Sequence, residues 1–352
     1  MIILVLNSGS SSIKYKLFDI SKNSEKLLDK GVLERIGEKI SSHKEALAII
    51  LKKMNRDIEA VGHRVVHGGD VFKESTLIDE GAIKSIERFS ELAPLHNPPS
   101  LLTINESRNI LSGIPHAAVF DTSFYQDMPE RAYLYAIPYK FFEKYRIRKY
   151  GFHGTSHRYV ATKAASILKR PLEKLSLITC HLGNGCSITA VENGRAIDTS
   201  MGFTPLEGLV MGTRSGDVDA AILPYIMEKE NLDINAVIDL LNKKSGLLGI
   251  SGISNDMREI IKEMGKNKKA ALAFDLFSYR IKKYIGAYAG VMGGCDAVVF
   301  TGGIGENQPL LMKDICKGVV AKSAKVLIIP TDEELMIARD TFELVKYANL
   351  RR

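Results

Sequence analysis

Two short segments of the chain place an arginine among glycines. Arg64 lies in residues 62–70 (GHRVVHGGD), and Arg214 lies in residues 211–217 (MGTRSGD). A planar guanidinium in such a setting can bind a phosphoryl group or a carboxylate through two parallel hydrogen bonds. An ordinary surface loop is the competing interpretation for either arginine alone. The pattern therefore predicts anion sites without saying which anion binds.

Two histidines four positions apart follow in residues 151–157 (GFHGTSH). Zinc is one candidate ligand for His153 and His157, but the glycines argue against a helix for the pair and no third ligand lies nearby in the sequence. We therefore interpret these histidines as hydrogen-bond donors to a phosphoryl oxygen rather than as zinc ligands.

Carboxylates stand at positions where a catalytic group or a magnesium ligand is expected. Asp121 follows a predicted strand end at residues 119–120, and Glu333 and Glu334 follow Pro330 near the C-terminus. Acidic residues also favour the first turn of a helix, so helix capping explains the two glutamates equally well. The residues alone leave both roles open.

Polar turns rich in glycine and serine expose backbone amides that can bind phosphate oxygens. They cover residues 7–12, 181–185 and 301–307. Hairpin geometry explains any one of these turns, but their recurrence favours a nucleotide whose phosphates are held between two hairpins. The chain has no P-loop motif, no strand-linked G-x-G-x-x-G with a suitably placed acidic residue and no protein-kinase motif set, so the nucleotide site is of another kind.

The elements that carry these turns occur twice. Residues 2–6 form a strand-like run and residues 13–19 an alternating one, and residues 175–199 repeat this arrangement with a further turn at 192–194. We therefore predict an internal duplication into two similar domains. Apolar spacing and glycine stops predict helices over 44–54, 157–168, 218–228 and 273–292, and a buried strand over 297–300 that opens into a glycine turn before a helix from about Pro309.

The composition is that of a globular protein. The chain has 352 residues, of which 45% are hydrophobic and 25% charged, enough for a large core and two domains. No apolar run approaches the ~20 residues of a membrane span and the first residues lack a basic flank, so we expect a cytoplasmic location. The net charge of +7 is spread along the chain, which favours a solvated surface that attracts small anions over nucleic-acid or membrane binding. The four cysteines form no C-x-x-C pair and are expected as reduced, buried thiols.

A series of motifs resembles, in content and in order, the signature motifs of the acetate kinases. They are NSGSSSIK at 7–14, GHRVVHGG at 62–69, APLHNP at 93–98, VFDT at 119–122, YGFHGTSH at 150–157, HLGNG at 181–185, MGTRSGD at 211–217 and GGIGEN at 302–307. Several of these motifs are long and peculiar to short-chain acyl kinases.

This resemblance implies an α/β protein with the duplicated ribonuclease-H-like fold of the actin, Hsp70 and sugar kinase superfamily, its two domains lying around a cleft. The first domain would comprise residues 1–121 with a returning C-terminal helix at 333–352, and the nucleotide-binding domain residues 122–332. The family also implies a homodimer.

The implied reaction is the reversible transfer of a phosphoryl group from ATP to acetate, giving acetyl phosphate and ADP directly, with Mg²⁺ or alternatively Mn²⁺. By the resemblance, Asn7 and Glu333 would hold the metal, and Asp121, His153, Arg214 and Arg64 would be catalytic. Arg64, Val66, Leu95, Phe152 and Pro205 would bind acetate, with His96 nearby. The nucleotide-binding residues would be Ser10, Ser12, Lys14, His181, Leu182, Gly183, Asn184, Gly185, Asp256, Met257, Arg258, Gly303, Ile304, Gly305, Glu306 and Asn307.

These roles suit phosphoryl transfer. A carboxylate substrate is already a nucleophile, so positioning and cationic groups around a metaphosphate-like transition state supply most of the catalysis. Asp121 is then expected to orient an arginine rather than to remove a proton.

Two departures from the family pattern are visible. The stretch between Lys14 and Arg64 is short, and Tyr125 stands where the family has another aromatic residue or a histidine. We expect neither to touch a residue with an assigned role. Propionate or butyrate kinase activity is the alternative function, because discrimination by one methylene is worth only ~1–3 kcal/mol. A non-catalytic ATP-switched module of the actin or Hsp70 kind is a remote alternative, since such a module has no need of Arg64, His153 and Arg214 together.

Overall fold

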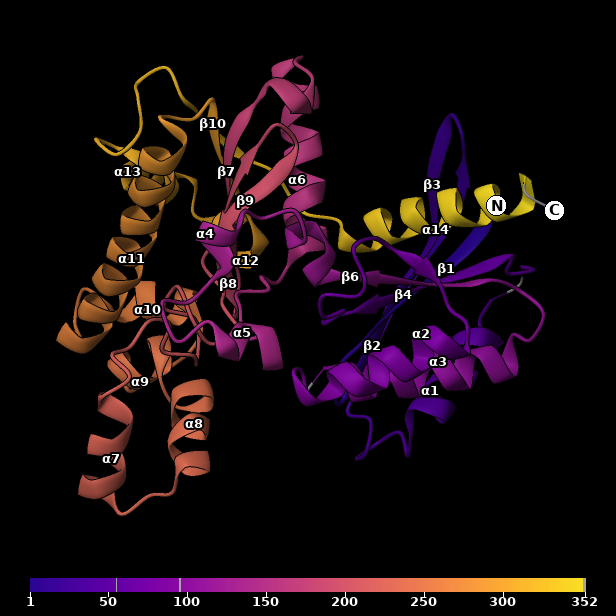
Figure 1. The fold of residues 1–352 in the computed structure, drawn as a ribbon, viewed down its shortest axis with the longest axis horizontal. Coiled ribbons are helices and arrows are strands. Elements are labelled where there is room, and N and C mark those ends of the chain that lie inside the picture. The colour runs from indigo at the N-terminus through magenta and orange to yellow at the C-terminus, as the bar shows by residue number, and fades with distance from the viewer. Residues whose placement is uncertain (55, 95, 351–352) are drawn as a thin grey trace. The chain divides into compact units, whose positions relative to one another are not determined.

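The computed structural model describes residues 1–54, 56–94 and 96–350. Contacts divide the chain into two compact units, each described here by itself (Figure 1). Unit 1 comprises residues 1–126, 152–156 and 332–352, and unit 2 comprises residues 127–151 and 157–331. The domain limits expected from the sequence stay a prediction.

Unit 1 is built on a six-stranded sheet with the strand order β3-β2-β1-β4-β6-β5. The first three strands form an antiparallel meander, and β4 and β6 run parallel to β1. The strands are β1 (Ile2–Ser8), β2 (Ser12–Ser21), β3 (Ser24–Glu34), β4 (Ala60–Val65), β5 (Thr76–Leu77) and β6 (His116–Phe120).

Both faces of this sheet are covered, which explains why β1 is apolar at successive positions. Side chains alternate between the two faces of a strand. Ile3 and Val5 pack in one core cluster with Ile337 of the C-terminal helix, whereas Leu4 and Leu6 pack in another. The helices of this unit are α1 (His43–Lys52), α2 (Glu80–Arg88), η1 (Phe89–Glu91), α3 (Asn97–Ile110), η2 (Asp121–Tyr125) and α14 (Glu333–Leu350).

Unit 2 repeats the strand connectivity of unit 1. Its five-stranded sheet has the order β11-β10-β7-β8-β9, in which β7, β8 and β9 form an antiparallel meander and β10 and β11 run parallel to β7. The predicted duplication is therefore confirmed. The strands are β7 (Ser176–Leu182), β8 (Cys186–Glu192), β9 (Arg195–Thr199), β10 (Ala297–Thr301) and β11 (Lys325–Ile328).

The predicted helices at 157–168, 218–228 and 273–292 correspond to α6 (Gly154–Leu168), α7 (Ile222–Glu230) and α11 (Lys268–Met292), whereas α8 (Ile234–Lys243) and α10 (Met257–Glu263) were not predicted. The long helix α11 ends where Gly293 adopts a left-handed φ of 69°, as the glycine stop predicts. The full set of described helices that start in or belong to this part of the chain is α4 (Glu130–Tyr133), α5 (Lys140–Tyr145), α6 (Gly154–Leu168), η3 (Leu172–Lys174), α7 (Ile222–Glu230), α8 (Ile234–Lys243), α9 (Gly246–Ser251), α10 (Met257–Glu263), α11 (Lys268–Met292), α12 (Gly302–Asn307) and α13 (Pro309–Cys316).

One local expectation was wrong. Residues 302–307 form a short helix, α12, rather than a glycine turn, because Gly302 makes the sharp turn alone with a φ of 79°. Helix α6 begins at Gly154, so His153 lies outside the helix that contains His157, as the glycines between them predict. Of the cysteines, Cys180, Cys186 and Cys316 are buried and Cys295 is partly exposed.

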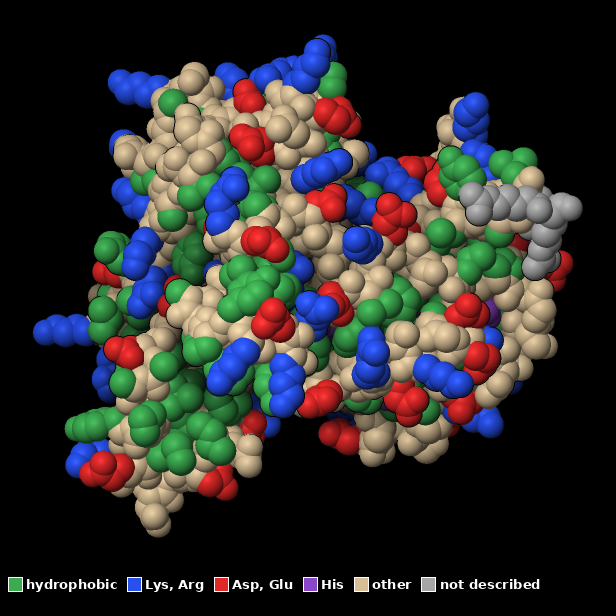
Figure 2. All heavy atoms as spheres, viewed as in Figure 1, with side chains coloured by type: hydrophobic (Ala, Val, Ile, Leu, Met, Phe, Trp, Pro, Cys, Tyr) green, Lys and Arg blue, Asp and Glu red, His purple; other side chains and the backbone are tan. Residues whose placement is uncertain are grey.

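Across the part of the chain that the structure describes, every helix is too short or too polar to cross a membrane. On the face drawn in Figure 2, Lys and Arg side chains alternate with Asp and Glu rather than gathering in one basic patch.

Candidate active site

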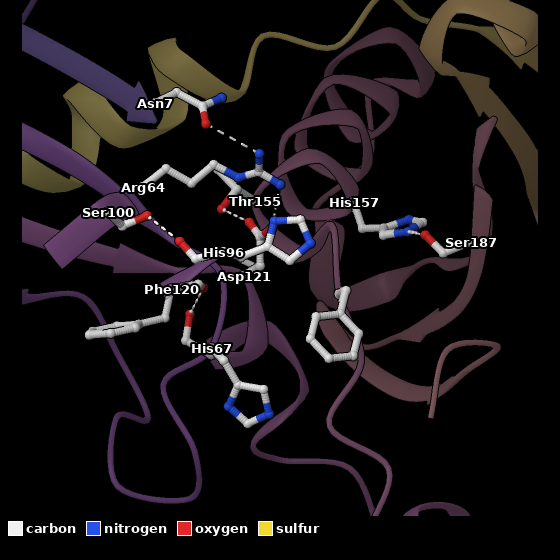
Figure 3. A network of polar contacts seen from close by, with 12 residues as sticks. Asn7, Arg64, His67, His96, Ser100, Phe120, Asp121, Thr155, His157 and Ser187 are labelled. Atoms are coloured by element: carbon white, nitrogen blue, oxygen red, sulfur yellow. Dashed lines mark hydrogen bonds and ion pairs between the residues drawn. The ribbon is translucent and has the colours of Figure 1, made fainter. Parts of the chain in front are cut away.

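The carboxyl ends of three neighbouring strands in unit 1 bring Asn7, Arg64 and Asp121 together. The parallel register pairs Leu6 with His63 and Arg64 with Val119, so these residues reach the same sheet edge. Arg64 Nη2 lies 2.6 Å from Asp121 Oδ2, and Arg64 Nη1 donates to Asn7 Oδ1 at 3.3 Å. Figure 3 shows these side chains pointing toward one another.

The Arg64 guanidinium is fixed but not fully satisfied. Its side chain is 19% exposed and that of Asp121 only 1%. Burial alone would lower the pKa of Arg64, but the negative charges of Asp121 and Glu333 outweigh burial and raise that pKa above its ordinary value. Arg64 Nε is buried without a hydrogen-bond partner. A cation held on two sides and still partly exposed is suited to receiving an anionic ligand.

The second oxygen of Asp121 is also held. Thr155 donates its hydroxyl to Asp121 Oδ1 at 2.9 Å, and both residues are buried. Asp121 therefore accepts from Arg64 with one oxygen and from Thr155 with the other. This arrangement fixes the carboxylate of Asp121, which in turn orients the Arg64 guanidinium.

The glutamates at the start of α14 have different surroundings. Glu334 Oε1 lies 2.8 Å from Lys14 Nζ, and Glu334 Oε2 lies 3.2 Å from Lys16 Nζ. Burial would raise the pKa of Glu334, but the two lysines outweigh burial and lower it. For Glu333, burial raises the pKa, and the charges of Asp121 and Glu334 add to this rise against the opposing effect of Arg64. A bound cation would therefore stabilise the ionised form of Glu333.

The turn after β1 carries Ser10 and Ser12. It is closed by a hydrogen bond from the Gly9 amide to the Ser12 carbonyl at 2.8 Å, and His43 Nε2 lies 2.9 Å from the Gly9 carbonyl. Ser8 Oγ is buried without a hydrogen-bond partner next to Asn7. The sequence motif drew attention to the serines at the tip, and the buried hydroxyl of Ser8 was missed.

The residues predicted to contact acetate are distributed as follows. Val66 is half-buried one residue beyond β4, and Phe152 is buried and packs its ring edge against His67. Asn97 bonds both the amide and the carbonyl of His67, at 3.1 and 2.9 Å, and so holds the chain just beyond Val66. Leu95 lies outside the described residues, and Pro205 belongs to unit 2.

Tyr125 contradicts one expectation directly. It was expected to touch no residue with an assigned role, yet its hydroxyl donates to the Phe152 carbonyl at 2.7 Å. The contact arises between segments distant in the sequence, which inspection of the motif itself does not reveal.

Unit 2 contains a pocket of about 430 Å³ at the ends of β7 and β10. Many of the residues predicted to bind nucleotide line it, although they come from three separate segments of the chain. Its described lining is Gly183, Asn184, Asn255, Asp256, Met257, Arg258, Gly303, Ile304, Asn307 and Gln308. Asn255 and Gln308 were missed, although each directly adjoins a predicted residue; Asn255 Nδ2 donates to Asn184 Oδ1 at 3.0 Å.

Other residues predicted to bind nucleotide are absent from this described lining. Ser10, Ser12 and Lys14 belong to unit 1. Glu306 turns back instead, and its Oε1 accepts from the amides of Gly302 and Thr331 at 3.0 and 3.3 Å. The rest are Leu182 and Gly305, which are buried, together with His181 and Gly185.

Arg214 lies in an irregular but well-bonded segment of unit 2. Its Nη1 donates to the Pro205 carbonyl at 2.8 Å, and burial lowers the pKa of Arg214 below its ordinary value. The segment is closed by Asp217, which accepts from the Gly208 amide and from the Tyr284 hydroxyl, each at 2.8 Å.

His157 is a structural residue. Its two ring nitrogens lie 2.7 Å from the hydroxyls of Thr179 and Ser187, and burial lowers its pKa well below the ordinary value. Figure 3 shows the contact with Ser187. Within the described residues, no group of three or more His, Cys, Asp or Glu side chains could hold a metal ion by itself.

The sequence matches the model of the acetokinase family over residues 2–322. The chain belongs to the acetokinase family. Acetate kinases from Heliobacterium modesticaldum and Caldanaerobacter subterraneus are 48% and 51% identical to it over 98% of this chain, covering 100% and 99% of their own lengths. A crystal structure of Porphyromonas gingivalis acetate kinase has 42% identity and a TM-score of 0.91, covering 98% of this chain and 99% of that one. This acetokinase is therefore a phosphotransferase whose acceptor is a carboxyl group.

The structural relatives also establish the fold of this acetokinase. A ROK family protein from Streptococcus pneumoniae has 13% identity and a TM-score of 0.51 over 99% of this chain and 100% of that one, a likeness of fold alone. The expected α/β, duplicated ribonuclease-H-like fold of the sugar kinase superfamily is confirmed. The alignments with the Heliobacterium and Caldanaerobacter enzymes run over 398 and 400 positions, so these relatives carry segments that the 352 residues of this acetokinase lack.

Proposed function

We propose that this acetokinase transfers a phosphoryl group reversibly between ATP and acetate, giving acetyl phosphate and ADP in one direct in-line step. The observation that carries the proposal is the Arg64 guanidinium, which is fixed by Asp121 and Asn7 while 19% of the side chain stays exposed. A substrate carboxylate is an anion of the size and charge that this group binds best. Family membership supplies the phosphoryl donor.

The side chains at this site promote phosphoryl transfer by orienting the reacting groups. Arg64 binds the acetate carboxylate, and Asp121 orients Arg64 instead of removing a proton, because both oxygens of Asp121 already accept hydrogen bonds. Val66 and Phe152 contact the methyl group, and the motif resemblance adds Leu95 and Pro205 to the residues proposed to bind acetate. His153 and Arg214 stabilise the charge on the transferring phosphoryl group, which is where most of the catalytic effect arises in such reactions.

The phosphates and the adenosine of ATP occupy the pocket at the ends of β7 and β10. The lining includes Gly183 and Gly303, which have no side chains, and the start of α10 contributes Asp256 and Arg258. Ser10, Ser12 and Lys14 complete phosphate binding. The pocket volume of about 430 Å³ supports a ligand of nucleotide size.

The donor set of unit 1 fits Mg²⁺, with Mn²⁺ as the alternative. Mg²⁺ in phosphoryl-transfer enzymes is held by one or two protein oxygens together with phosphates and water rather than by a protein cage. Glu333, whose pKa is raised by burial and by neighbouring carboxylates, and the amide oxygen of Asn7 provide such ligands. When bound, the metal neutralises charge on the phosphates.

Propionate is the second candidate acceptor. A propionate kinase from Francisella tularensis has 41% identity to this chain and a TM-score of 0.87, close to the values for acetate kinases. Butyrate is the third. The small pocket proposed around Val66 favours acetate, because overpacking a tight apolar site costs ~1–3 kcal/mol.

We also propose a homodimer in the cytoplasm. Apolar side chains that remain exposed on α7 and α8 support an interface between copies: Ile222, Tyr225, Ile234 and Ile238. Figure 2 shows hydrophobic side chains gathered over this region. Light scattering behind a sizing column measures the mass, and a monomer at micromolar concentration contradicts the dimer.

The activity is tested by trapping acyl phosphate with hydroxylamine, using acetate, propionate and butyrate with Mg²⁺-ATP. We expect kcat/KM to decrease from acetate to butyrate, and Val66→Ala to raise the value for propionate relative to acetate. Leu102→Ala is a matched control, because Leu102 is exposed on α3. No hydroxamate with any of the acids contradicts the proposed reaction, and equal kcat/KM for acetate and butyrate contradicts the acetate assignment.

A further inference from the structure

Residues 152–156 form a short segment of unit 1 whose chain neighbours on both sides belong to unit 2. This segment carries His153 and Thr155. Its place in unit 1 depends on contacts with η2, the 3-10 helix that follows β6 and begins with Asp121. These contacts are therefore what sets the position of His153 relative to Asp121.

Two side-chain hydrogen bonds hold the segment at its two ends. The Tyr125 hydroxyl at the end of η2 donates to the Phe152 carbonyl at 2.7 Å, and the Thr155 hydroxyl donates to Asp121 Oδ1 at 2.9 Å. Tyr125 is fully buried and Thr155 is 2% exposed, so water does not replace either bond readily.

Between these bonds the two backbones touch. A Cβ placed on Gly154 would lie only 1.9 Å from the Asp121 carbonyl oxygen, so only glycine permits this approach. The segment is thus fastened to η2 at Phe152, Gly154 and Thr155. We call this set of contacts the η2 strap.

The strap holds a strained residue. His153 has a φ of 56°, in the left-handed region that is costly for a residue with a Cβ. Such a conformation persists only when the surrounding structure imposes it. The two strap bonds involve Phe152, which precedes His153, and Thr155, which lies two residues after it. They therefore hold the backbone on both sides of His153.

We propose that Tyr125 and Thr155 are positioning residues for phosphoryl transfer. They hold His153 in its left-handed conformation, and Thr155 also fixes the Asp121 carboxylate whose other oxygen binds Arg64. This inference rests on the proposed function and deepens it. It assigns Tyr125, a departure from the family pattern, a place in the site.

The test uses variants that remove one hydroxyl and little volume. Thr155→Val and Tyr125→Phe each break one strap bond, and Thr155→Ser retains the hydroxyl. Thr341→Val and Tyr15→Phe are matched controls: both residues are buried in unit 1, Thr341 donates to the Ile337 carbonyl of its own helix, and the Tyr15 hydroxyl donates to Asp29.

We expect Thr155→Val and Tyr125→Phe to lower kcat for acetate about tenfold to a hundredfold, the scale of an ångström-level misplacement, with KM for Mg²⁺-ATP unchanged. Thr155→Ser should recover most of the loss. Both controls should retain the wild-type kcat while losing as much thermal stability as the strap variants. A wild-type kcat in both strap variants overturns the proposal.

A second readout does not depend on catalysis. Hydrogen exchange measured by mass spectrometry should be faster over residues 152–156 in both strap variants than in the wild type and the controls. If the wild-type enzyme makes no acetyl hydroxamate, the proposed function fails. The hydrogen-exchange rate over residues 152–156 then tests by itself whether Tyr125 and Thr155 hold the segment. Unchanged exchange over this segment overturns it.

Discussion

At the residue scale, the feature that organises unit 1 is a buried arginine with two acceptors already in place. Asp121 and Asn7 hold Arg64 from different nitrogens, so little side-chain freedom remains to be lost when an anion binds. Arg64 also stays charged at every accessible pH, because Asp121 and Glu333 raise its pKa despite burial. The site is thus prepared before its ligand arrives.

We predict that Arg64→Ala and Arg214→Ala each lower kcat/KM for acetate by roughly 10³-fold, as arginine groups do in phosphoryl transfer. Lysine should restore neither activity, because an ammonium group cannot make two parallel hydrogen bonds. Arg108→Ala is the control, since Arg108 pairs with Glu80 at an exposed site. Steady-state kinetics and circular dichroism separate lost chemistry from lost folding, and a near-normal rate in either alanine variant removes that arginine from the mechanism.

A second residue-scale prediction concerns acid stability. His63 Nε2 and His116 Nδ1 lie 3.1 Å apart, and burial lowers the pKa of His63 well below its ordinary value and that of His116 to about 4. The unfolded chain binds these protons below pH ~6.5 but the folded chain does not, so stability should fall as the pH drops from there.

Urea unfolding at pH 7 and pH 5 tests this. The wild type should lose about 1–2 kcal/mol for each such histidine over this range. His116→Gln should have a shallower loss, because one of the two buried histidines is then absent. An identical slope in the wild type and His116→Gln contradicts the assignment.

At the element scale, the two units place their chemical groups at equivalent positions. In unit 1 these groups lie at the carboxyl ends of β1, β4 and β6. In unit 2 they follow β7 and β10, which correspond to β1 and β4 in the strand order. Parallel strands end at a common edge, where ligands of open α/β sheets bind. The same connectivity thus presents carboxylate-binding groups in one unit and glycine-rich backbone in the other.

The segment that carries Arg214 gives an element-scale prediction. Tyr284→Phe removes the hydroxyl that α11 donates to Asp217, which should loosen the segment and lower kcat several-fold. ADP affinity, measured by calorimetry, should stay unchanged because neither Tyr284 nor Asp217 belongs to the described lining of the nucleotide pocket. Tyr279→Phe is the control, since Tyr279 is 64% exposed on the same helix. Equal loss in both variants contradicts a specific role for the Tyr284 bond.

Local patterns in the sequence predicted many of the elements. The turn at 192–194 is specified by Asn193 and Gly194, which both have positive φ, and the end of α11 by Gly293. Strand β3 was missed because it alternates poorly and most of its side chains are exposed. Helix α12 was missed because its glycines read as a loop.

The candidate site was predictable only where motifs carried it. Motifs located Arg64 and Asp121, but the Tyr125 contact with Phe152 and the return of Glu306 to the Gly302 amide depend on contacts that a single sequence does not contain. Asn255 and Gln308 were missed for a simpler reason, because the motifs stop one residue short of them.

At the scale of the whole molecule, the chain passes between the units at residues 126/127, 151/152, 156/157 and 331/332. Unit 1 is therefore completed by α14, whose Ile337, Ala338 and Val345 are buried in the cluster that includes Ile3 and Val5. Large apolar side chains of this kind contribute about 1.5–3 kcal/mol each when fully buried.

We predict that truncation after Thr331 unfolds unit 1 and leaves unit 2 able to bind ADP. Loss of Ile337 and Val345 uncovers the sheet face that they protect, whereas no residue of the nucleotide pocket is removed. Hydrogen exchange resolved by peptide and ADP calorimetry report on the two units separately. Tyr347→Ala, a change at an exposed position of α14, should leave both units folded. Protected amides in β1 and β4 of the truncated chain contradict the prediction.

The late position of α14 also bears on how the protein is made. During translation, β1 and β2 emerge from the ribosome first. Helix α14, which covers Ile3, Val5 and Phe18, emerges only after unit 2 has been synthesised. Domains generally fold as they emerge, and exposed apolar sheet faces promote aggregation. The nascent chain therefore carries an uncovered sheet face through most of its synthesis, and we expect the half that is translated first to reach its native state last.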